Sequence, residues 1–225
     1  MQKNRQRILV WGAGGHGKVV VDALIEGAQY EIGGIIDEDS SKHGTEILGV
    51  KVTAFEGDLM EAAKKLECDG VTIAIGDNYV RYEKFREIAR ANLAPVNVLH
   101  PRAGISRFVK MGEGVTILAG ATINAGTVIE DNVCVNTSAS IDHDNYLANS
   151  CHIFPNATLT GGIRVGECAY VGSGAVIKPN LTVQRYSYVG AGAVVVADVP
   201  EGTIVCGVPA KITGRQEKRP APEKR

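Results

Sequence analysis

A strict six-residue repeat runs from Met111 to Pro200 and constrains the fold of this chain more than any other feature. Fifteen consecutive hexads carry a branched or long apolar residue at the same place, without an insertion. These anchors are Met111, Ile117, Ile123, Ile129, Val135, Ile141, Leu147, Ile153, Leu159, Val165, Val171, Ile177, Val183, Val189 and Val195. The position four residues later is mostly small or apolar. Self-similarity at so short a period predicts a parallel β-solenoid built from hexapeptides.

One hexad cannot bury its own apolar side chains, but strands stacked about 4.8 Å apart form a continuous apolar column. Three hexads make one triangular coil, so residues 18 apart in the sequence should lie above one another, and fifteen hexads give five coils. A helix is excluded, because apolar anchors at an interval of six do not follow a 3.6-residue turn.

The residues before the repeat alternate between apolar strands and amphipathic segments, which predicts a small parallel α/β domain. We expect strands at 7–11, up to Asp37 and at 71–78, and helices after the glycine loop, at 58–66 and at 79–92. The expected domains are an α/β domain at 1–100, the solenoid at 101–200, and a cap with a mobile tail at 201–225.

Composition excludes several classes of function. A net charge of −1 over 225 residues argues against a nucleic-acid partner. No run approaches 18 apolar residues, and the opening MQKNRQRILVWG is too short for a signal sequence, so we expect no membrane contact and a cytoplasmic location. The five cysteines lack metal-ligand spacing, which predicts reduced thiols and no metal site.

The loop GAGGHG at 12–17 contains GxGxxG, and Asp37 follows it at the end of the next apolar run. This pattern alone suggests a dinucleotide site. A dinucleotide needs two mononucleotide-binding halves, however, and the domain is long enough for about one, so we favour a nucleoside diphosphate over a dinucleotide or a purely structural turn. Carboxyl ends of parallel strands share one edge of a sheet. The residues expected there are Gly14, Gly15, His16, Asp37, Glu38, Gly76, Asp77 and Asn78.

Backbone N–H groups of the glycine loop can hold phosphate oxygens. Carboxylates cannot, so Asp37 and Glu38 are assigned to ribose hydroxyls or to the base. His16 could contact phosphate or sugar, or could be only a solvated side chain.

Within the solenoid, the hexad Ile141-Asp142-His143-Asp144-Asn145-Tyr146 breaks the pattern that the others obey. Its inward small position holds the amide Asn145, and Asp-His-Asp precedes it. Such departures indicate functional sites, although a polar surface corner is the alternative. An imidazole between carboxylates suits a general base near neutral pH. Gly161 occupies the position one coil after His143 and leaves room for a slender ligand.

His152 lies half a coil after His143, so the two histidines should lie on opposite sides of the prism. At about 3.3 Å per residue they should be well over 10 Å apart within one chain. If both serve one site, that site lies between two subunits; otherwise His152 is a corner histidine in an interface.

The ordered motifs WGAGGHGKVVVD, GIIDED, AIGDN, VNTSASIDHDNYLANSCHIFPNATLTGGIRVG and IVCGVPAK resemble the PglD/NeuD-type bacterial sugar acetyltransferases of the hexapeptide-repeat superfamily. The resemblance implies a Rossmann-like domain that binds a nucleotide sugar and a left-handed β-helix. It also implies a homotrimer that holds acetyl-CoA between neighbouring subunits.

Carried over by position, the resemblance implies that His143 accepts a proton and that Asp144 raises its basicity. It assigns the sugar nucleotide to the residues of the sheet edge named above. Acetyl-CoA, as co-substrate, is assigned to His152, Gly161, Gly162, Ser173 and Ala191. The implied reaction moves acetyl directly to the 4-amino group of a UDP-4-amino-4,6-dideoxysugar. Alternatives are O-acetylation of a sugar such as sialic acid, a nicotinamide-dependent oxidoreductase, and a noncatalytic scaffold.

Overall fold

The computed structural model describes residues 5–216 and divides between Pro101 and Arg102 into two compact units. The tail predicted to be mobile, 217–225, lies outside the described residues. No helix within the described range is long and apolar enough to cross a membrane.

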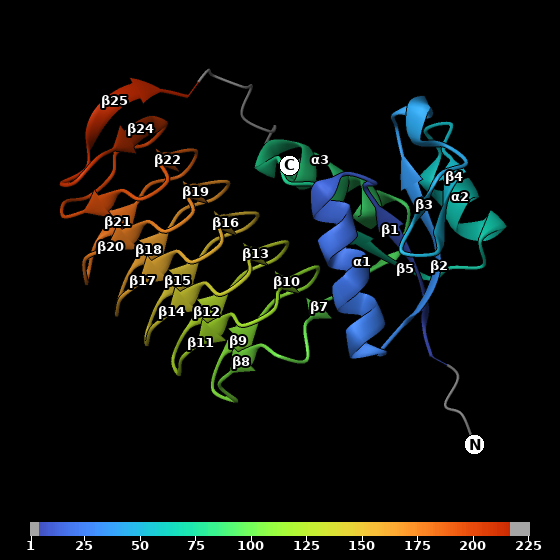
Figure 1. Cartoon of the computed structure of the whole chain (residues 1–225), viewed down its shortest axis with the longest axis horizontal. Helices are drawn as coiled ribbons and strands as arrows, with labels where there is room; N and C mark the ends of the chain where they lie inside the picture. The colour runs from blue at the N-terminus through green and yellow to red at the C-terminus, as the bar shows by residue number, and fades with distance from the viewer. Residues whose placement is uncertain (1–4, 217–225) are drawn as a thin grey trace. The chain divides into compact units, whose positions relative to one another are not determined.

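The first unit is built on a six-stranded sheet with the order β3-β4-β2-β1-β5-β6 (Figure 1). All neighbouring strands are parallel except the β3–β4 pair. The strands are β1 (Arg7–Trp11), β2 (Glu31–Asp37), β3 (Glu46–Ile47), β4 (Val50–Ala54), β5 (Gly70–Ile73) and β6 (Ala94–Pro95), and β7 (Val98–Leu99) follows. The helices are α1 (Gly15–Gly27), η1 (Ser40–Lys42), α2 (Leu59–Lys65) and α3 (Asn78–Arg90).

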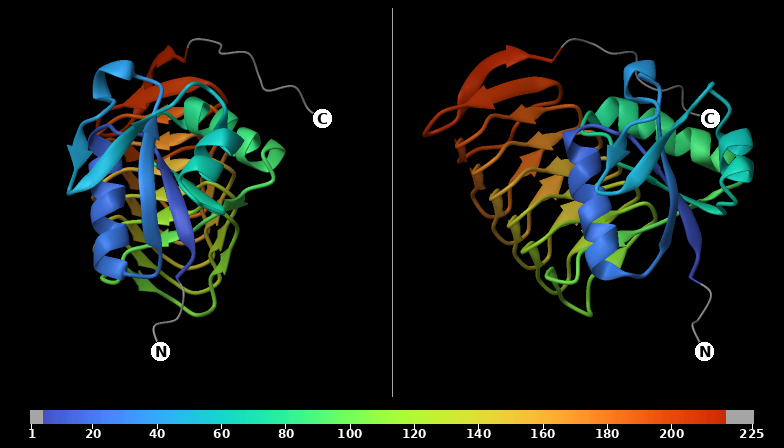
Figure 2. Two further views of the ribbon diagram at one scale, coloured as in Figure 1. Left: turned by 90° about the vertical axis from the view of Figure 1, so that its right-hand side faces the viewer. Right: turned by 45° about the vertical axis from the view of Figure 1, so that its right-hand side comes forward.

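Helices cover both faces of this sheet, with α1 on one face and α2 and α3 on the other (Figure 2). Leu9 and Trp11 of β1 pack in one apolar cluster with Leu59 of α2 and Ile88 of α3. Successive side chains of a strand point to opposite faces, so the buried Ile8 and Val10 face the α1 side. Burial on both faces explains why β1 is apolar throughout.

The sequence prediction located the three central strands but missed the three outer ones. β3, β4 and β6 extend the sheet at its two edges. Their segments are only half-buried and carry polar residues, so no apolar run marks them. The strand expected at 71–78 ends at Ile73.

The second unit is a left-handed parallel β-helix, as predicted. Each short strand ends on the apolar anchor of its hexad. The strands are β8 (Gly104–Ile105), β9 (Lys110–Met111), β10 (Thr116–Ile117), β11 (Thr122–Ile123), β12 (Val128–Ile129), β13 (Cys134–Val135), β14 (Ser140–Ile141), β15 (Tyr146–Leu147), β16 (His152–Ile153), β17 (Thr158–Leu159), β18 (Arg164–Val165), β19 (Tyr170–Val171), β20 (Val176–Ile177), β21 (Thr182–Val183), β22 (Tyr188–Val189) and β23 (Val194–Val195).

The coil length is confirmed by strand pairing: residues pair with partners 18 positions away, as Ile123 does with Ile141 and Val135 with Ile153. Pairing at this interval produces three parallel sheets that form the sides of the prism (Figure 1). The anchors from Ile117 to Val195 are almost wholly buried inside it.

From Gly114 to Gly192, every corner places the residue three positions after its anchor in the left-handed region. Glycine fills this place at Gly126 and Gly162, whereas Asp144 fills it with φ of 58°. Aspartate, asparagine and glycine tolerate this conformation best, which accounts for the polar corners.

The last coil is closed by β24 (Thr203–Cys206) and β25 (Lys211–Arg215), which form an antiparallel pair. β24 pairs with β22 at an interval of 16 rather than 18, as in Tyr188 with Ile204. The hexad register therefore ends where the cap begins.

Candidate active site

The glycine loop between β1 and α1 lies at the carboxyl edge of the first unit's sheet. Two of its glycines are required by the fold. Gly12 has φ of +124°, and a Cβ there would lie 2.6 Å from the carbonyl oxygen of Ala74. A Cβ on Gly17 would collide with the carbonyl oxygen of Gly12. These two positions bring the loop against β5 and fix the start of α1.

Three other glycines at the same edge have no such structural reason. A Cβ on Gly14, Gly15 or Gly76 would meet nothing within 4 Å, and none of the three has a positive φ. Gly14 caps the amino end of α1 without a side-chain hydrogen bond. Glycine here keeps the backbone N–H groups of a helix N-terminus open to an approaching anion. The glycines assigned to a ligand from the sequence are thus the ones with free space in front of them.

Asp37 holds the glycine loop in place. Its carboxylate accepts hydrogen bonds from the N–H groups of Ala13, at 2.7 Å, and Asp39, at 2.9 Å. It also receives Lys42 Nζ at 3.0 Å. Burial opposes its ionisation, but the two N–H donors and Lys42 outweigh burial and lower the pKa of Asp37. Asp37 therefore positions the loop, a role that the assignment to ribose or base did not foresee.

Asp77 also has a structural role that the sequence analysis did not assign. It is the N-cap of α3 and accepts hydrogen bonds from the N–H groups of Tyr79, at 2.9 Å, and Val80, at 3.0 Å. Asn78, the first residue of α3, is fully buried. The Gly-Asp-Asn turn thus follows β5 and starts α3, and Asp77 is of the residue type that is typical of an N-cap.

Glu38 is exposed and forms an ion pair with Lys84 of α3. The Lys84 ammonium also lies over the ring of Trp11, 4.5 Å from its centroid. The Glu38 carboxylate is therefore exposed at the surface beside the loop. Its partner Lys84 is held in place by the contact with Trp11 of β1.

His16 lies in the first turn of α1, close to a buried arginine that sequence reasoning missed. Burial, and then the charge of the Arg81 guanidinium, lower the pKa of His16 from 6.5 to about 4. The imidazole is therefore neutral near pH 7 and offers a hydrogen bond rather than a charge. Arg81 is 2% exposed and its Nη1 donates to the carbonyl of Ile75 at 3.3 Å. Its position in a charged helix gave no sign that it points back to the sheet edge.

In the solenoid, His143 lies at the corner after β14 with its side chain exposed to solvent. Its Nδ1 lies 2.8 Å from Oδ2 of Asp144, so the two form an ion pair when the ring is charged. The hydrogen bond to Asp144, and then the charge of Asp142, raise the pKa of His143. This bond leaves Nε2 as the nitrogen that can accept a proton from a substrate.

Small residues on the neighbouring coils make room for this dyad. A Cβ on Gly161 would come within 2.6 Å of Cε1 of His143, and a Cβ on Gly126 would collide with the Asp144 carboxylate. The imidazole lies against the coil that follows, as the predicted stacking of successive coils requires.

Four of the five residues assigned to acetyl-CoA fall into two groups. Gly161 and Gly162 form a corner next to His143, and the N–H of Gly162 donates to the His143 carbonyl at 3.1 Å. Ser173 and Ala191 are exposed and occupy equivalent positions on successive coils, at the corners that follow β19 and β22. The structure therefore brings Ser173 and Ala191 together, on a different edge of the prism from His143.

His152 begins β16, in the sheet that contains β19 and β22. It is 2% exposed, and its ring stacks on Phe154 with centroids 4.1 Å apart. Its Nε2 lies 3.2 Å from Nδ2 of Asn136. A direct contact with acetyl-CoA remains a prediction.

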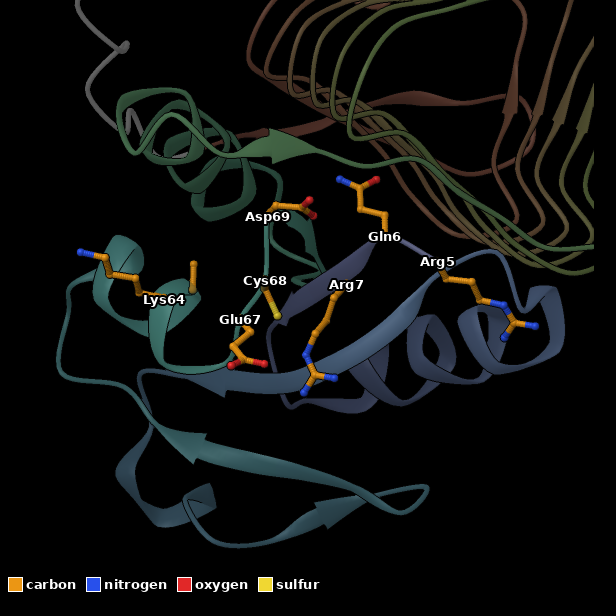
Figure 3. Close-up of a pocket in the computed structure, with 8 residues that line it drawn as sticks. Arg5, Gln6, Arg7, Lys64, Glu67, Cys68 and Asp69 are labelled. Atoms are coloured by element: carbon orange, nitrogen blue, oxygen red, sulfur yellow. The ribbon is translucent and has the colours of Figure 1, made fainter. Parts of the chain in front are cut away.

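A hollow of about 740 Å³ lies at the opposite, amino-terminal edge of the first unit's sheet (Figure 3). It is lined by Arg5, Gln6, Arg7, Ala63, Lys64, Glu67, Cys68 and Asp69. Arg7 there bonds the carbonyl of Leu66 at 2.9 Å and pairs with Glu31, so its charge serves the fold. Among the described residues, no group of three or more His, Cys, Asp or Glu side chains could hold a metal ion.

Comparison with known proteins gives consistent results. Residues 7–88 match the model of the PglD N-terminal domain family. GDP-perosamine N-acetyltransferase of Escherichia coli O157:H7 is 29% identical over 210 residues, which are 90% of this chain and 94% of that protein.

Two solved structures are similar over nearly the whole chain. PerB from Caulobacter crescentus, in complex with CoA and GDP-perosamine, is 38% identical with a TM-score of 0.86, covering 92% of this chain and 97% of that one. The acetyltransferase domain of PglB from Neisseria gonorrhoeae, in complex with acetyl coenzyme A, is 35% identical with a TM-score of 0.84, covering 92% and 99%. The chain therefore belongs to the PglD/NeuD-type sugar acetyltransferases of the hexapeptide-repeat superfamily, and it is an acetyl-CoA-dependent sugar N-acetyltransferase.

Proposed function

We propose that this protein acetylates the 4-amino group of a nucleotide-linked 4-amino-4,6-dideoxysugar, with His143 as the general base. The observation that carries the proposal is the exposed imidazole of His143, oriented by Asp144 and lying against Gly161. An imidazole whose Nδ1 is bonded to a carboxylate presents Nε2 to the substrate in a fixed direction.

In the proposed reaction the sugar amine attacks the thioester carbonyl of acetyl-CoA. A C–N bond forms, the C–S bond breaks, and the proton lost by the amine passes to Nε2 of His143 and then to the CoA thiolate. Backbone N–H groups near the corner or His152 would stabilise the oxyanion. All cysteines before the cap are buried, so none is available as an acyl carrier beside His143 and direct transfer is favoured.

We assign the nucleotide sugar to the carboxyl edge of the first unit's sheet. The free space in front of Gly14, Gly15 and Gly76 supports this assignment. Asp37 would position the loop, while the neutral His16 and the exposed Glu38 would form hydrogen bonds with the sugar nucleotide. We propose GDP in place of the UDP that the family resemblance implied, because PerB, at 38% identity, binds GDP-perosamine. Relatives named as N-acetyltransferases also favour an amine over the hydroxyl of a sugar such as sialic acid.

We further propose a homotrimer in which acetyl-CoA lies between subunits. The two groups of candidate CoA residues lie on different edges of one prism, which supports a site shared by two chains. Mixing inactive His143→Ala subunits with inactive Ser173→Trp subunits would then restore part of the activity. A monomer in sedimentation that is fully active would exclude the shared site.

The central test is an acetylation assay with acetyl-CoA and GDP- or UDP-linked 4-amino-4,6-dideoxysugars, each beside its 4-hydroxyl counterpart. We expect N-acetylation of the GDP-linked amine and a loss of roughly 100-fold or more in kcat for His143→Ala. Binding of both substrates, followed by calorimetry, should persist in that variant. Wild-type turnover by His143→Ala would remove the base assignment.

A further inference from the structure

We propose that Thr127 and Asn145 are positioning residues for the acetyl transfer, because together they hold the peptide between Asp142 and His143 from inside the solenoid. The inference deepens the proposed function and rests on His143 being the base. Neither residue contacts solvent, so each would act on catalysis only through His143.

Thr127 and Asn145 occupy the inward position four residues after an anchor, on two successive coils. The N–H of Val128 donates to the Asn145 carbonyl at 2.8 Å, so the two positions are stacked one above the other. Their exposed fractions are 0% and 1%. Most equivalent positions hold alanine, valine or cysteine, so this is a local polar column in an apolar interior.

Both side chains donate to one acceptor, the carbonyl oxygen of Asp142. Oγ1 of Thr127 lies 3.1 Å from it and Nδ2 of Asn145 lies 2.7 Å from it. This carbonyl belongs to the peptide whose N–H is that of His143. Two buried donors on a single carbonyl fix the orientation of that peptide. They therefore fix the position of the His143 backbone, from which the imidazole extends.

Asn145 also ties the corner to the next coil. Its Nδ2 lies 2.9 Å from the carbonyl of Thr160, and its Oδ1 accepts the N–H of Ile163 at 2.9 Å. These bonds join the coil of His143 to the coil whose Gly161 contacts the imidazole. This buried amide therefore adds two side-chain bonds to the backbone bond between Gly162 and His143, and together they fix the position of the ring relative to Gly161.

The same peptide is held from outside the prism. The Asp142 carboxylate accepts the N–H of His143 at 2.9 Å and Nδ2 of Asn124 at 2.8 Å. The peptide's N–H and its carbonyl are thus both bonded to side chains, beyond the hydrogen bonds between coils that every corner shares. Burying polar groups costs free energy that alanine or valine would not cost, so the arrangement favours placement over stability.

The solenoid offers a matched control at Ser187. It occupies the same inward position, is fully buried, and its Oγ donates to the carbonyl of Gln184, three residues earlier, as Asn145 does to Asp142. The Gln184 corner contains no histidine. Ser187→Ala therefore removes an equivalent buried bond away from the proposed base.

The test compares Thr127→Val, Thr127→Ser and Ser187→Ala with the wild type, for kcat, KM of both substrates and melting temperature. Valine keeps the shape of threonine without the hydroxyl, whereas serine keeps the hydroxyl and loses the methyl group. We expect Thr127→Val to melt at or above the wild-type temperature but to lose roughly fivefold in kcat with both KM values unchanged. Thr127→Ser should melt lower yet retain most of kcat. Ser187→Ala should retain the wild-type kcat whatever its melting temperature.

Asn145→Ala provides a second, stronger variant, for which we expect a loss of about tenfold or more in kcat with both KM values unchanged. If kcat instead follows melting temperature across all the variants, the two residues are only structural and the inference is wrong. An inactive His143→Ala enzyme beside a fully active Thr127→Val enzyme would overturn this inference alone. An active His143→Ala enzyme would overturn both the inference and the proposed base.

Discussion

The imidazole of His143 lies directly against Gly161 of the following coil, so that a methyl group at residue 161 would come within 2.6 Å of Cε1. Gly161 has no positive φ, and its glycine is therefore required by the neighbouring ring rather than by its own backbone. The space in front of Gly161 is also where the amine of the proposed substrate would approach Nε2 of His143. Residue 161 thus controls where the proposed base can lie.

We expect Gly161→Ala to fold but to lose kcat by roughly 100-fold, because the added methyl group displaces the ring from its productive position. Steady-state kinetics and a melting curve would measure both effects. Gly104→Ala is the control, since a Cβ there would meet only Thr122 Oγ1, at 3.8 Å. A Gly161→Ala enzyme with wild-type kcat would show that ring placement does not limit the reaction.

The repeat made the solenoid predictable, because it follows a single rule of one apolar anchor every six residues. That rule sets where each strand ends, which side chains are buried, and that residues 18 apart pair on successive coils. The same rule exposed the corner at His143, since Asn145 is a buried amide where apolar or small residues are usual. The outer strands β3, β4 and β6 could not be predicted, because their half-buried segments contain no apolar run.

The sequence predicted which residues gather at the carboxyl edge of the first unit's sheet, but it did not predict what each of them does there. Gly15 and Gly17 look alike in the sequence, and only the structure shows that one faces free space and the other faces a carbonyl. Likewise, a carboxylate after a strand can bind a ribose or cap a loop. Asp37 and Asp77 serve the backbone, a distinction that depends on contacts between segments far apart in the sequence.

The pH dependence of the reaction should report the bond between His143 and Asp144. The base must be unprotonated, so kcat/KM should rise with pH through the pKa of His143, which Asp144 and then Asp142 raise above 6.5. Asp144→Asn removes the carboxylate, so this rising limb should move to lower pH while the maximum falls. Asparagine tolerates the φ of 58° at this corner, so the backbone should persist.

Asp131→Asn is the control for that profile, because Asp131 bonds the N–H of Glu113 and does not contact His143. Its pH profile should match the wild type. A rising limb that stays in place in Asp144→Asn would mean that Asp144 does not set the basicity of the ring.

The two kinds of glycine in the loop at 12–17 should separate the proposed nucleotide binding from folding. Gly15 is the first residue of α1 and faces free space, so Gly15→Ala should leave stability unchanged or raise it by up to about 1 kcal/mol. Its methyl group would block the approach of the diphosphate, and we expect KM for the nucleotide sugar to rise about tenfold or more. Gly17→Ala should instead destabilise the first unit by about 1–3 kcal/mol, because its Cβ collides with the Gly12 carbonyl. Equal KM values for Gly15→Ala and wild type would place the diphosphate elsewhere.

His16 should make the first unit less stable in acid. Its pKa is about 4 in the folded chain and about 6.5 when unfolded, so between these values the unfolded chain binds a proton that the folded chain does not. The contribution of His16 to stability is therefore complete above pH 6.5 and falls as pH decreases toward 4.

Trp11, the single tryptophan, is buried in the first unit and can report its unfolding in urea. The difference in urea midpoint between wild type and His16→Gln should be constant above pH 6.5. Below pH 6.5, the midpoint of the wild type should fall relative to that of His16→Gln. An NMR titration of His16 should give a midpoint near 4 that rises in Arg81→Met, because the guanidinium opposes the charged ring. A midpoint near 6.5 in the wild type would mean that His16 is solvated and can meet a phosphate as a cation.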